Sequence, residues 1–487
     1  MINSQIIEDA IYDLCVQANT TLPKDVVEKI SDAYNHEINP DAKQALALIL
    51  ENAKMAYEKK MPLCQDTGQV LVFIKGSAKL IPDNINEIVN NSVSKAYEEN
   101  FFRKSVVKNA LFDRANTKTN TPCVIYTEIT PQDELEIELL IKGAGSENVC
   151  NLEMLSPTAS EDDIIEFVVS TVQKAGAKGC PPYFIGIGIG GTMEYAGILS
   201  KKALLLEENI DENHKNLAKK IKDAVNNLGV GAAGLGGAAT ALDVKILTDF
   251  THIACMPVAV TINCHSSRHA KCVIGGTGVE AKSKKQKAKS DEAPTLEECY
   301  CEEGQSPDAA IQSVHRSPFT VHPIKIHTSE IAKLKSLKIG QNILLSGEIY
   351  TARDMAHKML IEMIEKGEKL PFDLKNKIIF YAGPCPSPCD ECVVGSIGPT
   401  TASRMDKFTP TLYKNGILAT IGKGERSEEV QKIIKQSGGI YFTMIGGIAC
   451  YLSEKFIKKD LICFEDLGTE AVYRFEVKDL PIRVAIV

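Results

Sequence analysis

A stretch that cannot contribute to a hydrophobic core interrupts this chain beyond its midpoint. Between Ala281 and Asp308 the composition becomes rich in Lys and then in Glu, Ser and Pro, with little apolar periodicity. Because 487 residues also exceed what one ordinary core accommodates, we expect two domains joined at this stretch. The predicted organisation is a first domain over 1–280, a linker over 281–308 and a second domain over 309–487.

Apolar spacing predicts helices followed by strands in the first domain. Helical spacing fills about the first sixty residues, and strand-like runs follow at Gln69–Ile74, Cys123–Ile129 and around Leu135–Leu139. Ser160 begins a helix with a capping-box-like start, and Gly176 is placed to end it. Two glycine-rich stretches are typical of loops or of tight packing sites: Gly186 to Gly191 and Gly231 to Gly237.

The second domain alternates apolar runs with helical stretches, which is typical of an α/β fold. The predicted strands lie at 343–349, 378–382, 417–421 and 440–444, and the predicted helices include 354–366 and 428–436. The predicted fold class is therefore α/β and α+β, with a larger N-terminal domain of mixed helix and sheet and a smaller C-terminal α/β domain.

Charge and hydropathy exclude several classes of function. The formal net charge is −8, whereas a nucleic-acid-binding protein presents a concentrated basic face. The N-terminus has no basic region followed by an apolar core, and no stretch approaches roughly eighteen uninterrupted apolar residues. We therefore expect a cytoplasmic protein with small ligands, no nucleic-acid partner and no membrane partner. Its 15 scattered cysteines are then expected to be thiols or metal ligands.

Short motifs in the first domain collect groups that can bind a ligand. Cys64-Gln-Asp-Thr-Gly68 places a thiol, an amide, a carboxylate and a hydroxyl in one turn-like segment. Cys180 precedes two prolines and several glycines that allow close backbone approach, but no nucleotide-binding fingerprint is present. A third segment contains His252, Cys255, Cys264 and His265; its spacing matches no common zinc finger, although a structural zinc site stays open.

Cationic loops in the second domain favour a carboxylate ligand. Arg353 follows a predicted strand and begins a helix, where an anion is stabilised. Gly398 to Arg404 adds two hydroxyls and an arginine near another expected helix start, and Lys423 lies in a glycine loop. One arginine alone would indicate only a solvated face, but three such loops after successive strands indicate a site.

Taken together, these motifs resemble class I fumarate hydratases and the related tartrate dehydratases over nearly the whole chain. The chain looks like the α-type and β-type parts of that family fused into one polypeptide. The matching segments are Cys64-Gln-Asp-Thr-Gly, Gly179-Cys-Pro-Pro, Cys264-His, Gly398-Pro-Thr-Thr-x-x-Arg-Met-Asp406 and Ile421-Gly-Lys-Gly.

The resemblance implies an oxygen-sensitive [4Fe-4S] cluster held by Cys64, Cys180 and Cys264. Its fourth iron would lack a protein ligand and could act as Lewis acid and template. The implied enzyme is a homodimeric hydro-lyase of the tricarboxylic acid cycle that adds water to fumarate and gives (S)-malate. L-tartrate or a methylated fumarate stay open as substrates, and a cluster-based redox or metal sensor is the alternative from another class.

The resemblance also implies residues around a small dicarboxylate, with Thr400 as base and Asp66 as acid. Removing a proton beside a carboxylate builds charge that positioned cations stabilise. A free hydroxyl is too weak a base, so Thr400 would need activation by neighbouring cations. The implied substrate-binding residues are Gln65, Arg103, Gly145, His252, Arg353, Thr401, Arg404 and Lys423.

Several cysteines are not explained by the resemblance. Cys385, Cys389 and Cys392 have the C-x3-C-x2-C spacing of the cluster motif in radical enzymes that use S-adenosylmethionine. A redox-sensitive or metal-binding loop is a second interpretation, and inert thiols are the one we favour, because the intervening acidic residues oppose an anionic cluster. Cys299 and Cys301 in the predicted linker have no assigned role.

Overall fold

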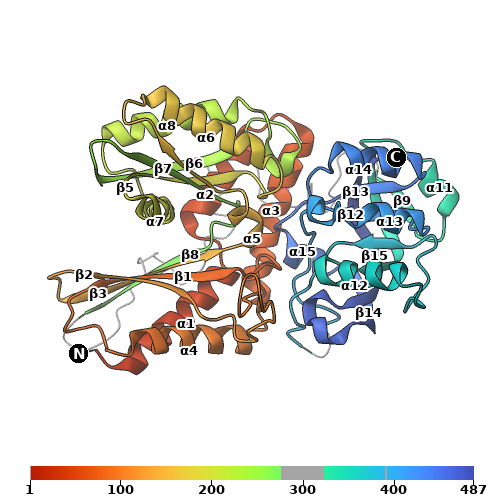
Figure 1. Cartoon of the computed structure of the whole chain (residues 1–487), viewed down its shortest axis with the longest axis horizontal. Helices are drawn as coiled ribbons and strands as arrows, with labels where there is room; N and C mark the ends of the chain where they lie inside the picture. Colours follow the sequence, from red (N-terminus) through yellow and green to blue (C-terminus); the bar gives the residue numbers. More distant parts are fainter. Residues whose placement is uncertain (1, 276–322, 390–391) are drawn as a thin grey trace, which may run out of the picture.

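The computed structural model describes residues 2–275, 323–389 and 392–487. They form two four-stranded sheets before residue 276 and one seven-stranded sheet after residue 322 (Figure 1). The predicted fold class is confirmed, with a larger N-terminal and a smaller C-terminal domain. The predicted linker, Cys299 and Cys301 lie outside the described residues, so the domain boundaries stay predictions. Among the described helices, none combines the length and hydropathy of a membrane span.

Three helices begin the chain, as its apolar spacing predicted. They are α1 (Ser4–Thr20), α2 (Lys24–His36) and α3 (Pro40–Lys59). Asn3 and Asn39 cap α1 and α3, because their side-chain oxygens accept hydrogen bonds from N–H groups of the first turn. The helix α3 lies centrally, between the sheets of the N-terminal domain and the C-terminal domain (Figure 1).

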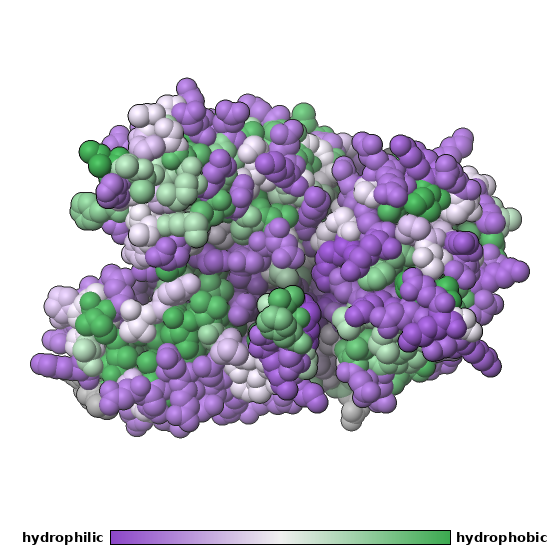
Figure 2. Space-filling view, viewed as in Figure 1, coloured by the Kyte–Doolittle hydropathy of each residue, from purple (hydrophilic) through white to green (hydrophobic). Residues whose placement is uncertain are grey.

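The first sheet has the strand order β2-β1-β3-β8. Its strands are β1 (Gln69–Gly76), β2 (Val124–Ile129), β3 (Glu134–Lys142) and β8 (His269–Gly275). The predicted alternation in β3 is confirmed, since Leu135, Ile137 and Leu139 are fully buried. α1 and α4 (Ile85–Glu99) lie below this sheet in Figure 1, and hydrophobic side chains border the furrow above it in Figure 2.

The second sheet has the order β4-β7-β5-β6 and lies between helices. Its elements are β4 (Asn151–Leu155), β5 (Tyr183–Gly191), β6 (Ala241–Thr251), β7 (Met256–Asn263), α6 (Glu161–Ala175), α7 (Met193–Ala203) and α8 (Glu212–Asn226). The capping box of α6 forms as predicted, between Ser160 and Asp163. A Cβ at Gly186 would lie 2.1 Å from the carbonyl oxygen of Ser200 in α7. The first glycine stretch is therefore a tightly packed strand and not a loop.

The C-terminal sheet has the order β14-β15-β13-β12-β11-β10-β9, and β15 also pairs with β10. The pairings from β9 through β13 are parallel, as the predicted α/β alternation requires. Its strands are β9 (Ile324–His327), β10 (Asn342–Thr351), β11 (Ile378–Phe380), β12 (Ala419–Gly422), β13 (Ile440–Thr443), β14 (Phe456–Cys463) and β15 (Val472–Ile486). Its main helices are α12 (Asp354–Glu365), α13 (Thr409–Lys414), α14 (Glu428–Gln436) and α15 (Ala449–Ser453).

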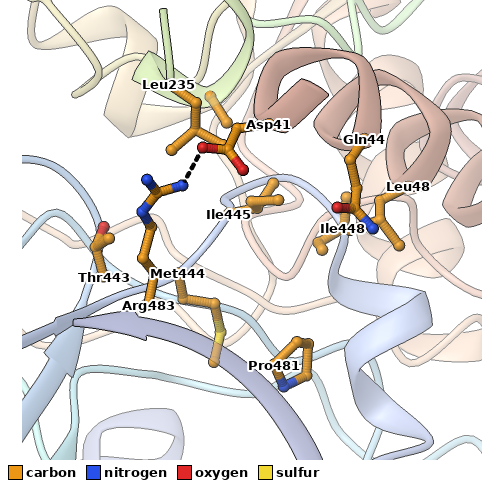
Figure 3. Close-up of a pocket in the computed structure, with 11 residues that line it drawn as sticks. Asp41, Gln44, Leu48, Leu235, Thr443, Met444, Ile445, Ile448, Pro481 and Arg483 are labelled. Carbon is orange, nitrogen blue, oxygen red and sulfur yellow. Dashed lines mark hydrogen bonds and ion pairs between the residues drawn. The ribbon is translucent and has the colours of Figure 1, made fainter. Parts of the chain in front are cut away.

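The two domains are held together along α3. The side chain of Asn52 accepts a hydrogen bond from the backbone N–H of Tyr451 in α15 at 3.0 Å. At one edge of the interface, Asp41 and Arg483 form an ion pair beside a cavity of about 30 Å³ (Figure 3). These contacts bring the loops at the ends of β11 to β13 onto the segment that connects α3 to β1.

Candidate active site

The three cysteines predicted to hold a cluster come together where the two domains meet. Cys64 lies between α3 and β1, Cys180 just before β5, and Cys264 just after β7. Burial raises the pKa of Cys64 to about 11, and negative charge on Cys264 and on Cys180 adds to that effect. The three thiols are therefore within electrostatic range of one another, although they come from distant parts of the sequence.

Cys180 is held in an unusual conformation beside a cation. Its φ of 62° lies in the left-handed region, which costs a non-glycine residue about 1–2 kcal/mol. The Nζ of Lys423 lies 2.7 Å from its Sγ. Burial raises the pKa of Cys180, and the charge of Lys423 opposes that effect. A Cβ at Gly446 would lie 2.7 Å from the same Sγ, so only glycine fits there.

Buried cations near the three cysteines suit the charge of an iron–sulfur cluster, in which each thiolate binds a different iron. Within the described residues, no group of three or more His, Cys, Asp and Glu is placed to hold a single metal ion. Two buried cations offset the negative charge of three thiolates, since Lys423 lies beside Cys180 and Arg268 lies near Cys64.

Asp66 forms a buried ion pair with Arg103. Its carboxylate lies 3.0 Å from the guanidinium of Arg103, and the two side chains are 18% and 6% exposed. It also accepts hydrogen bonds from the backbone N–H groups of Ala144 at 2.8 Å and Gly68 at 3.2 Å. Burial raises the pKa of Asp66, but Arg103, Arg268 and these donors outweigh it and lower the pKa to about 2. Asp66 is therefore a carboxylate at neutral pH.

Arg268 belongs to the site but was missed by the sequence analysis. It is 2% exposed and donates to the backbone carbonyl of Asp66 at 2.6 Å and to the side chain of Asn19 at 3.4 Å. Its only signal in the sequence is its position four residues after Cys264, in Cys264-His-Ser-Ser-Arg268. Nothing local predicts that an arginine there is buried beside thiols.

Loops of the C-terminal domain contact the residues around Asp66 and Arg103. Gln65 donates to the carbonyl of Pro399 at 3.3 Å, and Arg103 donates to the carbonyl of Gly383 at 2.8 Å. Thr400 is 7% exposed, and its carbonyl accepts the backbone N–H of Lys423 at 3.1 Å. The predicted base is thus adjacent to a predicted cation, and both domains contribute to the site.

The two predicted carboxylate-binding arginines are already paired with carboxylates of the chain. Arg353, the N-cap residue of α12, donates from Nε at 3.0 Å and from a terminal nitrogen at 2.7 Å to Glu470. Both of these donors share one oxygen of Glu470, whereas Arg404, which is 38% exposed, donates in a fork to the two oxygens of Asp354. The helix start expected near Arg404 is that of a short 3₁₀ helix, η2 (Ala402–Met405), and α13 begins at Thr409.

A cavity of about 460 Å³ lies between the domains next to this group. Three predicted substrate-binding residues line it: Gly145, in the short helix α5 (Ala144–Glu147), Thr401 and Arg404. A Cβ at Gly145 would lie 3.2 Å from the Nζ of Lys423. The cavity therefore leads toward Lys423 and Cys180 past a residue that has no side chain.

His252 is not brought to the site within this chain. It is exposed in the turn between β6 and β7, whereas Cys264 follows the other end of β7. Eight residues of strand separate the two ends by about 26 Å. Cys264 and His265 therefore cannot share one metal ion with His252 and Cys255, so the zinc interpretation is wrong.

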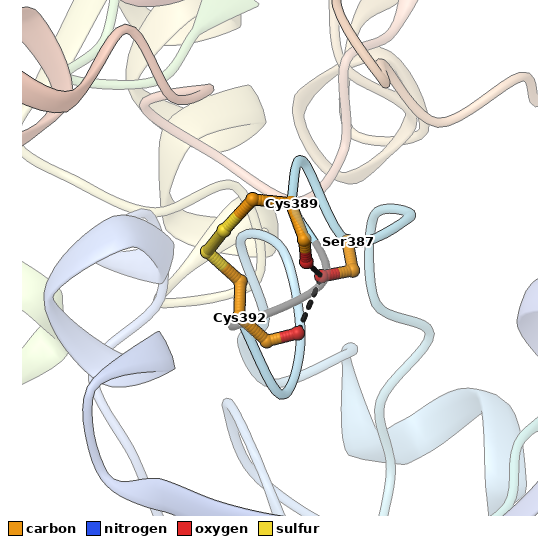
Figure 4. The surroundings of a disulfide bond; sticks show 3 residues. All are labelled: Ser387, Cys389 and Cys392. Atoms are coloured by element: carbon orange, nitrogen blue, oxygen red, sulfur yellow. Dashed lines mark hydrogen bonds between the residues drawn. A yellow bond between two sulfur atoms is a disulfide. The ribbon is translucent and has the colours of Figure 1, made fainter.

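The cysteine-rich loop of the second domain does not present three thiols. Cys389 and Cys392 form a disulfide, and the hydroxyl of Ser387 donates to the carbonyl of Cys389 at 2.8 Å (Figure 4). Cys385 is a buried free thiol whose Sγ donates to the carbonyl of Gln65 at 3.5 Å. The prediction of three inert thiols is wrong for Cys389 and Cys392, which form the disulfide. A cluster bound by all three cysteines is not supported either, because a disulfide offers no thiolate.

The chain matches two family models that together cover most of its length. The model of the fumarate hydratase family matches residues 8–273, and that of the fumarase C-terminus matches residues 295–487. The chain belongs to the class I fumarate hydratase family. The α-type and β-type parts of this family are thus fused in one chain, as the sequence motifs predicted.

Relatives of this fumarase-family chain include one-chain and separate-subunit proteins. It is 30% identical to the putative class I fumarate hydratase of Geobacillus stearothermophilus, over 97% of this chain and 92% of that protein. It is 28% identical to the anaerobic class I fumarate hydratase of Escherichia coli, over 97% and 86%. The putative L(+)-tartrate dehydratase subunit alpha of Methanocaldococcus jannaschii is 41% identical, but over 54% of this chain and 96% of the subunit.

Proposed function

We propose that this chain catalyses the reversible addition of water to fumarate, which gives (S)-malate. The observation that carries the proposal is the buried pair of Asp66 and Arg103 beside three neighbouring thiols. Relatives similar along nearly the whole chain are fumarate hydratases, whereas the tartrate dehydratase subunit matches only 54% of this chain. Fumarate is therefore favoured over L-tartrate and over a methylated fumarate.

The chain's own residues suit each part of such a reaction. Arg103, Arg353 and Lys423 are cations at the junction of the domains, and they would bind the two carboxylates of the substrate. Asp66 would accept a proton from the attacking water during hydration and return it to the leaving hydroxyl during dehydration. Its ionised state therefore suits the hydration direction. Thr400 would exchange the proton of the substrate carbon, and its hydroxyl would need activation by a cation; its backbone carbonyl accepts the N–H of Lys423.

A [4Fe-4S] cluster is the cofactor that this family membership and the three thiols support. Cys64, Cys180 and Cys264 would hold it, and Lys423 and Arg268 would balance its charge. When bound, such a cluster supplies a Lewis acid at an iron that has no protein ligand. We also propose the sensitivity to oxygen that such an exposed iron confers and a homodimer, both of which rest on the resemblance to the family. The cytoplasmic location that the sequence analysis predicted is part of the proposal as well.

The first experiment tests the activity and the cofactor together. We expect protein purified without oxygen to contain about four irons and four sulfides per chain and to interconvert fumarate and malate. Exposure to air should remove the activity, because an iron without a protein ligand is open to oxidants. Full activity after prolonged aeration and chelation would contradict the cluster. Iron and sulfide without turnover of fumarate, malate, tartrate or methylated fumarate would instead favour a cluster-based sensor.

A second prediction concerns the forked contact of Arg404. Replacing Arg404 with lysine should lower kcat/KM by about tenfold or more, because lysine lacks the bidentate fork. Arg474→Lys is the control, since Arg474 is 37% exposed and donates from two nitrogens to one oxygen of Asp460, in a pair between β15 and β14. Steady-state kinetics with fumarate checks the prediction. A kcat/KM within about twofold of the wild type would show that Arg404 does not bind the substrate.

A further inference from the structure

The cavity between the domains is cationic although the chain as a whole is acidic. It is lined by Lys174, Lys178 and Arg404, and none of its described lining residues is Asp or Glu. The formal net charge of the chain is −8, so this concentration of positive charge is local. A cleft lined by one sign of charge focuses the field and raises the local concentration of ions of the opposite sign.

The two lysines have no carboxylate partner within the described residues. Neither Lys174 nor Lys178 has an ion pair there, whereas Arg404 pairs with Asp354. The ammonium of Lys178 donates to the carbonyl of Lys174 at 3.4 Å, in the last turn of α6. Carbonyl groups at a helix C-terminus favour a cation, so the ammonium group is held at this place. Two uncompensated positive charges therefore lie at the cavity wall.

The cavity lies next to the candidate active site. Thr401 donates to the carbonyl of Lys178 at 3.5 Å, which joins the lysine segment to the loop that contains Thr400. Gly145 separates the cavity from Lys423, and a Cβ there would lie 3.6 Å from the carbonyl of Lys178. Lys178 at the cavity wall and Lys423 at the site therefore lie on either side of one glycine.

We propose that this cavity is an anion-collecting entrance, in which Lys174 and Lys178 attract a small dicarboxylate dianion before it reaches Lys423. The proposal rests on the proposed function for the identity of the substrate, but the cavity and its charge do not depend on that function. The two lysines act on encounter and not on the chemical step, so they should affect kcat/KM and leave kcat nearly unchanged.

The test is the double variant Lys174→Gln with Lys178→Gln, in the whole chain prepared without oxygen. At an ionic strength of about 0.01 M, where the Debye length is about 30 Å, kcat/KM for fumarate should fall about fivefold. The deficit should shrink to below about twofold at about 1 M, where the Debye length is about 3 Å. The control is Lys432→Gln with Lys435→Gln, which removes two exposed charges from α14.

Binding of succinate, a dicarboxylate without a double bond, separates this proposal from the proposed function. Titration calorimetry at low ionic strength should show weaker binding to the double variant than to the α14 control, whether or not the protein turns over fumarate. Equal succinate affinity and equal salt dependence of kcat/KM in both double variants would overturn the entrance. If the wild type does not turn over fumarate but the two double variants still differ in succinate binding, only the proposed function would be overturned.

Discussion

Replacing Cys180 with serine is expected to remove the iron from anaerobically purified protein and to abolish hydration of fumarate. The cluster would keep only two protein thiolates, and Lys423 would lose the sulfur that lies 2.7 Å from its ammonium. Iron should fall from about four per chain to below about one, and activity should fall at least about a hundredfold. The measurement is iron and sulfide per chain, with the electron paramagnetic resonance spectrum of the reduced protein. Cys64→Ser and Cys264→Ser should behave alike.

Two controls distinguish the loss of a ligand from the loss of any cysteine. Cys450→Ser changes a buried thiol in α15. Burial raises the pKa of Cys450, and the charged groups that also affect this pKa are Lys59 and Glu454 and not the three site cysteines. Cys389→Ser with Cys392→Ser removes the disulfide of the second domain. Both should keep about four irons per chain. Loss of iron from the disulfide variant, with retention in Cys180→Ser, would overturn the cluster assignment and the proposed mechanism.

Replacing Asp66 with asparagine is expected to lower kcat by about a thousandfold, because positioned acid–base groups contribute roughly 10²–10⁴ in rate. It should also lower the free energy of unfolding by about 3 kcal/mol, because Arg103 would keep its charge in a buried site without a partner. KM should change less than kcat, since the cations that would bind the carboxylates remain. Steady-state kinetics and thermal unfolding, both without oxygen, measure the two effects separately.

The matched control for this variant is Asp406→Asn. Asp406 lies 2.7 Å from Arg426, and these side chains are 17% and 0% exposed, close to the values for Asp66 and Arg103. We expect a similar loss of stability but a decrease in kcat of less than about tenfold, because Asp406 holds a loop and does not face the thiols. If Asp66→Asn lost no more activity than Asp406→Asn, Asp66 would have a structural role only.

Local patterns of the sequence predicted most of the secondary structure. Buried alternation in β3 and the capping box of α6 both form as expected, because each depends on residues a few positions apart. The glycines of β5 show the limit of this reasoning. Their sequence suits a loop or a packing site equally well, and only the approach of the α7 backbone, 2.1 Å from a Cβ at Gly186, distinguishes the two.

Motifs in the sequence also predicted the family, whereas the tertiary structure decided which side chains become partners. Asp66 pairs with Arg103, and Arg268 is buried beside them, through contacts between residues that are far apart in the chain. His252 and Cys264 belong to one segment, yet the length of β7 separates them. Periodicity and capping act over one or two turns and so can be read from the sequence. Ion pairs, disulfides and cavities depend on which distant segments fold together, and local spacing does not contain that information.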